Sequence, residues 1–291
     1  MTEGTSNSIL NLGEIAKPVE ALIEKISNAV GGVCAPWQIK RIAKAEMEAE
    51  IIKEQGRIQV TDLHRRAMQR FIEEQARNQK NIEDITAKAL PQLNETANPN
   101  AMEDDWITNF FQNSRIVSDV EMQDLWSRVL AGEANKPGTY SKRTVNLLSD
   151  LDKLDAELFS KLCGFAWMIQ GLVPLVFDYQ ANIYNMHKID FDALIHLESI
   201  GLIQFNALAG FTRLKLPRRF PLYYYGRPLL FEMPKESDNI LGIGKVLFTK
   251  TGRELAPVCG STPVEGFWEY ASDQWKKLLQ MPKTYGEATI E

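Results

Sequence analysis

The chain has 291 residues, of which 44% are hydrophobic and 24% charged, and its formal net charge is −5. This composition is typical of a soluble globular protein with one large or two ordinary domains. The negative net charge argues against a molecule that binds nucleic acid through its overall charge. No run of about 18 apolar residues predicts a transmembrane helix, and the first residues lack the basic and apolar parts of a secretory signal.

The three cysteines, Cys34, Cys163 and Cys259, are far apart and include no CxxC pair. An odd, scattered set of this kind does not predict a disulfide framework or a zinc site. We therefore expect a reducing, cytoplasmic setting, with Cys163 as a buried structural thiol on an apolar helix face. We expect no cofactor and no metal.

Residues 1–16 are expected to be a disordered tail, and residues 17–92 an extended helical region. Apolar spacings of three and four predict a helix from about Lys17 to Val30, with Pro18 in its first turn. A second helix is expected from Pro36 to about Gln55.

A long helix is expected from about Thr61 to Leu90, with Pro91 ending it. Its charges are dense and of both signs, and its apolar stripe is thin. A thin stripe on a long charged helix is typical of a coiled-coil-like or partner-helix contact.

Residues 101–172 are expected to form a compact helical domain. Ser118, with Glu121 at capping-box spacing, is expected to begin one helix, and Ser141 another. Asp152 or Asp155 is expected to begin the helix that carries these apolar residues: Leu158, Leu162, Phe165 and Trp167.

Residues 186–260 are expected to form a winged-helix-like α+β domain, followed by an amphipathic helix over residues 263–281. The reason is a short helix ending in LESIGLI, then several strand-like stretches, then TKTGREL. The expected fold class is mostly α, with a helical N-terminal and middle region before this C-terminal domain.

Several segments resemble a bacterial family of unknown function. They are KPVEALIEKISNAVGG, PWQIKRIAKAEMEAE, EDDWITNFF, MQDLWSRVLAGEANKPGTYSKRTVNLLSDLDKLDA and GKVLFTKTGRELAPVCGS. The resemblance runs from about Leu12 to Trp275. The helix LWSRVLA, the short loop after it and LSDLDKLDA are also remotely similar to the Abi-alpha class of abortive-infection proteins, which implies a link to phage defence.

The segment from Phe205 to Leu255 holds nine Lys or Arg residues against four acidic ones, with aromatic residues between them. If this segment forms the wing of the expected winged-helix domain, its basic and aromatic side chains are able to lie along phosphates. The alternative is a sheet with solvated basic residues on one face. The residues expected to contact nucleic acid are Arg213, Arg218, Arg219, Lys245 and Arg253. The helix Phe191–Ser199 carries no Lys or Arg, which argues against reading of the major groove.

Arg57 and His64 have the R-x6-H spacing that resembles HEPN-type ribonucleases, although a solvated helix face is the favoured interpretation. The carboxylates of Glu103 to Asp105 follow a Pro/Asn linker, so we interpret them as helix-start residues rather than metal ligands. His187 and His196 lack a third ligand at useful spacing, and we interpret them as ordinary surface or boundary histidines.

The helix from Lys17 to Val30 also has the form of a membrane-surface helix, but its acidic and basic residues balance, so helix packing is favoured. Taken together, the residues predict no catalytic group. The favoured function is a non-enzymatic interaction or scaffold protein that binds a protein partner or a second copy of itself. The alternatives are a nucleic-acid-binding winged-helix protein and a HEPN-like ribonuclease, and peripheral membrane contact is a further, weaker possibility.

Overall fold

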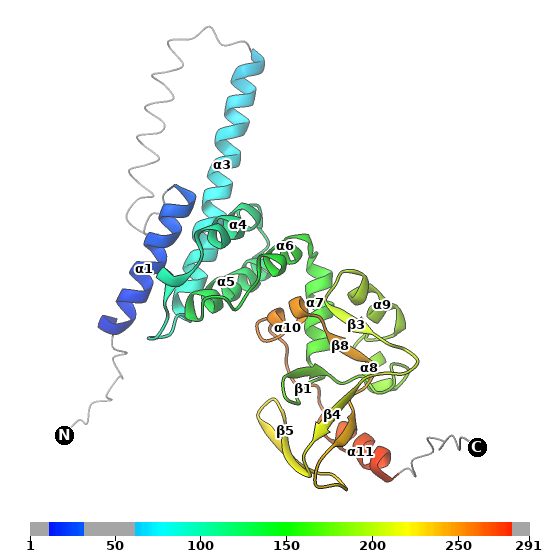
Figure 1. Ribbon diagram of the computed structural model, residues 1–291. Helices are drawn as coiled ribbons and strands as arrows, with labels where there is room; N and C mark the ends of the chain where they lie inside the picture. The colour runs from blue at the N-terminus through cyan, green and yellow to red at the C-terminus, as the bar shows by residue number, and fades with distance from the viewer. Residues whose placement is uncertain (1–11, 32–61, 281–291) are drawn as a thin grey trace, which may run out of the picture. The chain divides into compact units, whose positions relative to one another are not determined.

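The computed structural model describes residues 12–31 and 62–280 (Figure 1). The chain forms two compact units, Met1–Asp150 and Leu151–Glu291. The expected helix from Pro36 to Gln55 lies outside the described residues, as does Cys34.

The described part of the first unit is helical. Its elements are α1 (Leu12–Val30), α3 (Asp62–Ala89), η1 (Leu90–Gln92), η2 (Pro99–Ala101), α4 (Asp104–Ser114), α5 (Val120–Asn135) and α6 (Lys142–Asp150). Helix α3 packs against α5, α4 packs against α6, and α1 packs against α4 and η2. The expected long helix is thereby confirmed to within one residue at each end. Helix α1 begins five residues earlier than expected, so Pro18 lies inside it.

Aromatic side chains form the centre of the first unit. Phe110 is fully buried, and its ring lies 5.0 Å from the ring of Trp126 and 5.1 Å from that of Trp106. The indole N–H of Trp106 donates to the main-chain oxygen of Tyr140 at 2.7 Å, so this polar group is satisfied inside the core. The paired aromatic residues thus fix α4 against α5 and against the turn that precedes α6.

Polar side chains set the helix starts. Asp119 caps α5 because its Oδ1 accepts from the N–H groups of Glu121 and Met122, both at 3.0 Å. The expectation that Ser118 caps this helix is therefore wrong by one residue. Ser141 precedes α6, and its Oγ accepts from Thr144 N at 3.3 Å.

The second unit mixes helices and strands. Its helices are α7 (Lys153–Cys163), α8 (Asn182–Asn185), α9 (Phe191–Ser199), α10 (Lys250–Leu255) and α11 (Phe267–Gln280). Its strands are β1 (Ala166–Met168), β2 (Leu172–Pro174), β3 (Ile203–Phe205), β4 (Thr212–Leu216), β5 (Arg219–Tyr224), β6 (Arg227–Glu232), β7 (Asn239–Gly242) and β8 (Val246–Phe248). Asp152 and Asp155 both contribute to the start of α7, where they form a capping box.

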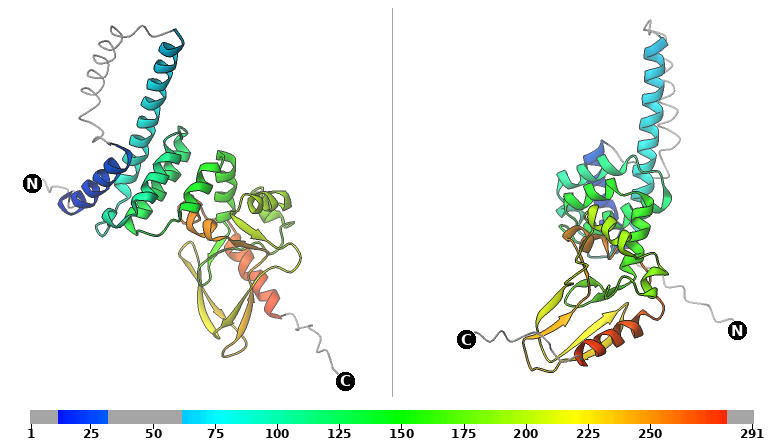
Figure 2. Two further views of the ribbon diagram at one scale, coloured as in Figure 1. Left: turned by 45° about the horizontal axis from the view of Figure 1, so that its top comes forward. Right: turned by 90° about the vertical axis from the view of Figure 1, so that its right-hand side faces the viewer.

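These strands make three small antiparallel sheets, in the orders β2-β1-β5-β6, β3-β8 and β4-β7. Strand β5 alternates between exposed and buried residues, with Phe220, Leu222 and Tyr224 facing inward. Helix α11 lies beside the strands in both views of Figure 2. It contributes the buried Trp275, whose ring packs at 5.1 Å from that of Trp167 and at 5.5 Å from that of Phe231.

The expected fold class, mostly α with a winged-helix domain over residues 186–260, is wrong, because the chain is a mixed α+β protein. In a winged helix the strands after the last helix form one hairpin. Here β3 pairs instead with β8, and the chain between them enters two other sheets, one of which includes β1 and β2 from before residue 186.

The helix expected to carry Phe165 and Trp167 also ends earlier, at Cys163. Gly164 follows it, and a Cβ at this position would lie 2.9 Å from the main-chain oxygen of Thr262. The close approach of that second segment turns the chain into strand β1, where Trp167 becomes a core residue of the sheet layer.

Candidate interaction surface

Helix α3 has two halves with different surroundings. From Asn78 onward one face is buried against the unit, and the Asn81 side chain donates to Arg115 O at 2.8 Å while Lys88 pairs with Asp124 at 2.7 Å. The half before Asn78 is exposed, except for the half-buried Ile72. Figures 1 and 2 show this exposed half extending past α4 and α5.

One stripe of residues runs along both halves. In the buried half it contains Ile82, Ile85 and Ala89. Followed backward in steps of three and four, the same stripe reaches Phe71 and Met68, which are 58% and 60% exposed. The complete stripe is His64, Met68, Phe71, Gln75, Asn78, Ile82, Ile85 and Ala89. Steps that alternate between four and three residues keep the stripe on one side of the helix, where it is able to face a single partner helix over several turns.

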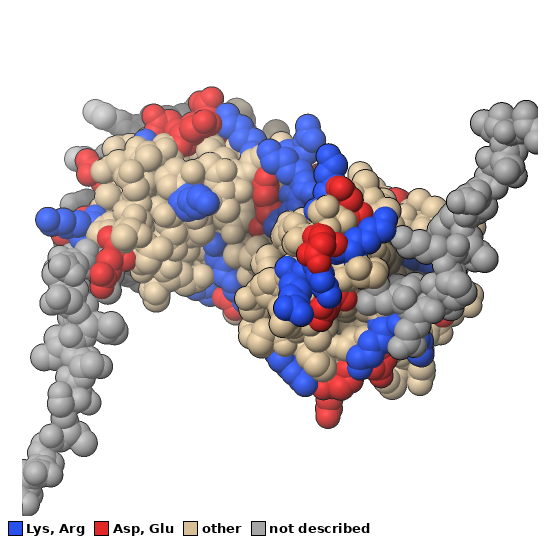
Figure 3. Space-filling model, turned by 60° about the horizontal axis from the view of Figure 1, so that its bottom comes forward, with Lys and Arg blue, Asp and Glu red and all other residues tan. Residues whose placement is uncertain are grey.

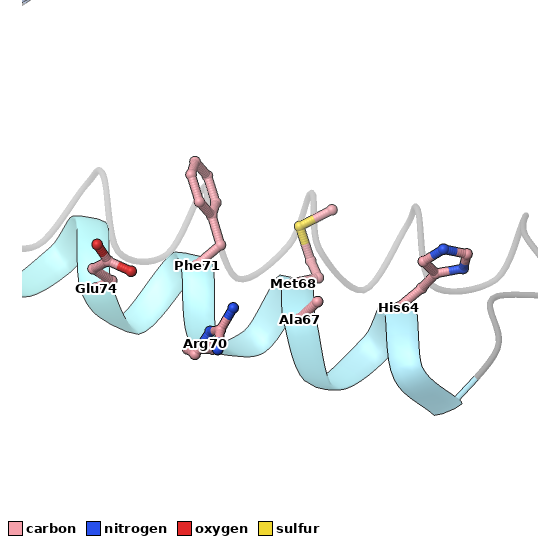
Figure 4. Close-up of a pocket in the computed structure, with 6 residues that line it drawn as sticks. All are labelled: His64, Ala67, Met68, Arg70, Phe71 and Glu74. Atoms are coloured by element: carbon pink, nitrogen blue, oxygen red, sulfur yellow. The ribbon is translucent and has the colours of Figure 1, made fainter.

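A hollow lies along this exposed face, and Figure 4 shows the described side chains that line it. They are His64, Ala67, Met68, Arg70, Phe71 and Glu74. All six come from α3. A helix face with large apolar side chains suits another helix better than it suits an enclosed small molecule.

The charges on the exposed half of α3 are nearly balanced. Four arginines, Arg65, Arg66, Arg70 and Arg77, stand among three acids, Asp62, Glu73 and Glu74. Arg65 forms an ion pair with Asp62, and the Gln69 amide donates to Glu73 at 3.2 Å. A surface with both signs of charge is compatible with binding a copy of itself, because like charges do not dominate.

The arginines expected to contact nucleic acid are largely engaged with acids. Arg218 pairs with Glu236 at 2.6 Å, and both Arg218 and Arg219 contact Glu232, at 3.3 and 3.1 Å. Nearby, Arg227 pairs with Glu269 at 2.7 Å and lies over the Trp268 ring. These acids lower the local positive potential that phosphate binding requires.

The remaining candidates are distributed over different elements. Arg213 lies in β4 and is half-buried, Lys245 precedes β8 and stands 4.9 Å from the Tyr179 ring centre, and Arg253 is exposed on α10. On the face that Figure 3 shows, Lys and Arg side chains are interspersed with Asp and Glu. The five residues thus do not form one stripe in a single sheet.

The histidines considered as candidate site residues do not gather into one site. His196 pairs with Asp155 at 2.6 Å, and the half-buried His187 packs against Phe165. His64 is exposed on α3, while Arg57 lies outside the described residues. No group of three or more His, Cys, Asp or Glu residues gathers in a metal-binding arrangement within residues 12–31 and 62–280.

The acidic residues before α4 are at the helix start, as expected, with Asp104 and Asp105 in its first turn. Asp104 pairs with Lys25 at 2.5 Å and Asp105 with Lys142 at 3.3 Å. The apolar side of α1 packs inside the same unit, where Leu22 and Ile26 are fully buried. None of the helices in the described ranges combines the length and the apolar character needed to cross a membrane.

Two thiols that the sequence analysis treated separately lie together in the second unit. The Cys163 and Cys259 side chains are within hydrogen-bonding reach of each other. Their separation along the chain gives no sequence signal for this pairing, because it depends on how the segment after α10 returns to the end of α7.

Residues 65–272 match the family described as "Protein of unknown function (DUF2806)". The chain belongs to this family. The match includes most of α3 and extends into α11. None of the curated proteins matches the chain, and none of the solved structures does. Membership of DUF2806 assigns no activity, in agreement with the expected family of unknown function.

Proposed function

We propose that this protein is a non-enzymatic interaction protein that self-associates through the exposed half of α3. The observation that carries the proposal is the continuation of the buried stripe into exposed apolar residues. Met68 and Phe71 are each more than half exposed, although the same face of α3 is buried further along. Burying such side chains against a second helix is favourable by roughly 1.5–3 kcal/mol each.

The occupant we propose is α3 of a second copy. The near balance of arginines and acids supports this choice, because an acidic or basic partner would favour a surface of one sign. The alternating steps of four and three residues support it as well, since two identical stripes of this kind are able to pack side by side. Nucleic acid is the weaker alternative, because Glu232 and Glu236 neutralise Arg218 and Arg219.

Light scattering on the full chain after size-exclusion chromatography tests the proposal. The wild type is expected to elute with twice the chain mass, and the Met68→Glu, Phe71→Glu double variant as a monomer. A matched control adds the same two charges on the opposite side of the same helix, through Gln69→Glu and Ala76→Glu. The control should keep the wild-type mass. A wild type that is monomeric at high concentration contradicts the proposal.

The resemblance of LWSRVLA and LSDLDKLDA to Abi-alpha proteins supports a place for this self-association in phage defence. A plaque assay on bacteria that express the chain tests this step separately. Fewer plaques are expected with the wild type than with the Met68→Glu, Phe71→Glu variant. Equal plaque numbers with and without the chain would contradict a role in phage defence. Self-association would then still be tested separately by light scattering.

A further inference from the structure

The end of α7 and the segment after α10 bring two cysteines together. Cys163 is the last residue of α7 and is 1% exposed, whereas Cys259 is half-buried. The Cys259 thiol donates to Ala256 O at 3.2 Å. The Cys163 thiol and the hydroxyl of Ser160, about one helical turn before Cys163, interact electrostatically with it. Cys259 thus lies against one face of α7.

The main chain around both cysteines is held by tyrosine hydroxyls. Tyr224 Oη donates to Gly164 O at 2.7 Å and accepts from Val264 N at 2.6 Å. Tyr225 Oη lies 2.7 Å from Ser261 Oγ and 3.2 Å from Cys163 O. These bonds join the residues that follow each cysteine. Both segments are therefore held side by side, as a disulfide between their cysteines would require.

The surroundings of the two sulfurs differ. The Cys163 thiol, the Ser261 N–H and the hydroxyls of Ser261 and Ser160 donate toward Cys259 and lower its pKa from the ordinary value of 9.0 to about 7. Burial raises the pKa of Cys163 well above that value. At neutral pH the half-buried Cys259 is therefore partly thiolate, the form that reacts, and the fully buried Cys163 remains a thiol.

We infer that Cys163 and Cys259 are a peroxide-reactive thiol pair, in which Cys259 is attacked first and Cys163 closes a reversible disulfide. The Cys259 thiolate takes the terminal oxygen of hydrogen peroxide or an alkyl hydroperoxide, giving a sulfenic acid and releasing, after protonation, water or an alcohol. The Cys163 sulfur then displaces the sulfenic oxygen, which leaves as a second water. The two thiols together lose two electrons and two protons, and the two electrons reduce one peroxide O–O bond.

The arrangement favours this chemistry over the other uses of paired thiols. A structural zinc site needs four ligands, and no third His, Cys, Asp or Glu joins this pair among the described residues. Two thiols that served only as packing would both be expected to be buried, whereas Cys259 is partly open. The inference does not depend on α3 or on self-association.

The test uses the full-length chain with Cys34→Ser, so that only the two paired thiols are counted. After reduction, a small excess of hydrogen peroxide is expected to remove both free thiols from each chain. Peptide mass spectrometry should find the Cys163 and Cys259 peptides joined, and dithiothreitol should restore both thiols. Added glutathione serves as a control that the peroxide is active. If glutathione is oxidised while both protein thiols persist, the inference is wrong. A disulfide that joins different chains would also overturn it.

Two variants test the separate roles. With Cys163→Ala the sulfenic acid at Cys259 has no thiol to close on, so dimedone is expected to label Cys259. With Cys259→Ser, Cys163 is expected to stay a free thiol after the same treatment. Circular dichroism on both variants verifies that they are folded. A dimedone adduct on Cys163 in a folded Cys259→Ser variant would contradict the assigned order.

Discussion

The carboxylate of Glu133 accepts a hydrogen bond from the main-chain N–H of Tyr140 at 2.8 Å, across the turn that joins α5 to α6. Its other oxygen accepts from Gly138 N at 2.6 Å. Glu133 is 3% exposed, so these bonds compensate for the removal of its charge from water. Next to it, Gly132 leaves room for the Tyr140 ring, whose atoms come within 2.8 Å of where a Cβ would stand. The segment LAGEANKPGTY is therefore a turn fixed by hydrogen bonds to Glu133 and by the packing of Tyr140 on Gly132.

Replacing Glu133 by glutamine should lower the free energy of unfolding by about 1–3 kcal/mol, because one main-chain N–H loses its acceptor in the interior. Burial raises the pKa of Glu133 above its usual 4.5. The folded state then holds this proton more tightly than the unfolded chain does, so the contribution of Glu133 to stability falls as pH rises from 4.5 through the raised pKa. Urea unfolding of wild type and Glu133→Gln should show a larger difference at pH 4.5 than at neutral pH. A difference that grows with pH would contradict this assignment.

Gly252 in the TKTGREL segment stands against the main chain of Leu202. A Cβ at Gly252 would lie 2.0 Å from Leu202 O, which no rotamer change relieves. Gly252→Ala is therefore expected to lower the free energy of unfolding by more than about 3 kcal/mol. Lys250→Ala, at an exposed position of the same helix, should change it by less than about 0.5 kcal/mol. Similar midpoints for Gly252→Ala and wild type in thermal unfolding would show that α10 does not pack this closely on Leu202.

The alkylation rate of Cys259 reports its pKa directly. In the Cys34→Ser chain, the rate constant for reaction with iodoacetamide should rise with pH and reach half its maximum near pH 7. In urea the midpoint should move toward 9.0, because the donors that stabilise the thiolate are lost. If the pH midpoint of alkylation were the same in the folded protein as in urea, the proposed stabilisation of the Cys259 thiolate by its neighbours would be wrong.

Nucleic-acid binding is expected to be weak and to show little dependence on salt. A protein that neutralises several phosphates loses affinity steeply as salt increases. Because Glu232 and Glu236 occupy Arg218 and Arg219, titration of DNA or RNA at low salt should give little or no saturable binding. Tight binding that weakens with salt, and that is lost when Arg213, Arg218, Arg219, Lys245 and Arg253 are replaced by alanine, would favour the nucleic-acid alternative instead.

Local patterns in the sequence were sufficient to locate both ends of α3 and the starts of α6 and α7, whereas α1 begins five residues before its expected start. The apolar spacing and Pro91 place the end of α3, and Ser141 and Asp152 begin α6 and α7 because their side chains bond to main-chain groups a few residues away. Where two neighbouring residues were both suitable caps, as at Ser118 and Asp119, the sequence did not decide between them.

Long-range contacts explain the failures. Phe165 and Trp167 continue the apolar spacing of α7, but the approach of Thr262 to Gly164 ends the helix before them. Strand β1 pairs with the nearby β2 but also with the distant β5, and β7 pairs with the distant β4, so part of their pairing has no local signal. The same reason hides the meeting of Cys163 with Cys259 and of Arg218 with Glu236. In each case the partner is determined by tertiary structure.

The central claim is that the exposed face of α3 binds α3 of another copy. Chains with ¹⁴N and ¹⁵N are mixed, each carrying a photo-crosslinking amino acid in place of Phe71, and the crosslinked peptides are weighed after irradiation. The account predicts crosslinks that join an α3 peptide of one isotope to an α3 peptide of the other. Crosslinks that join only peptides of the same isotope would contradict it.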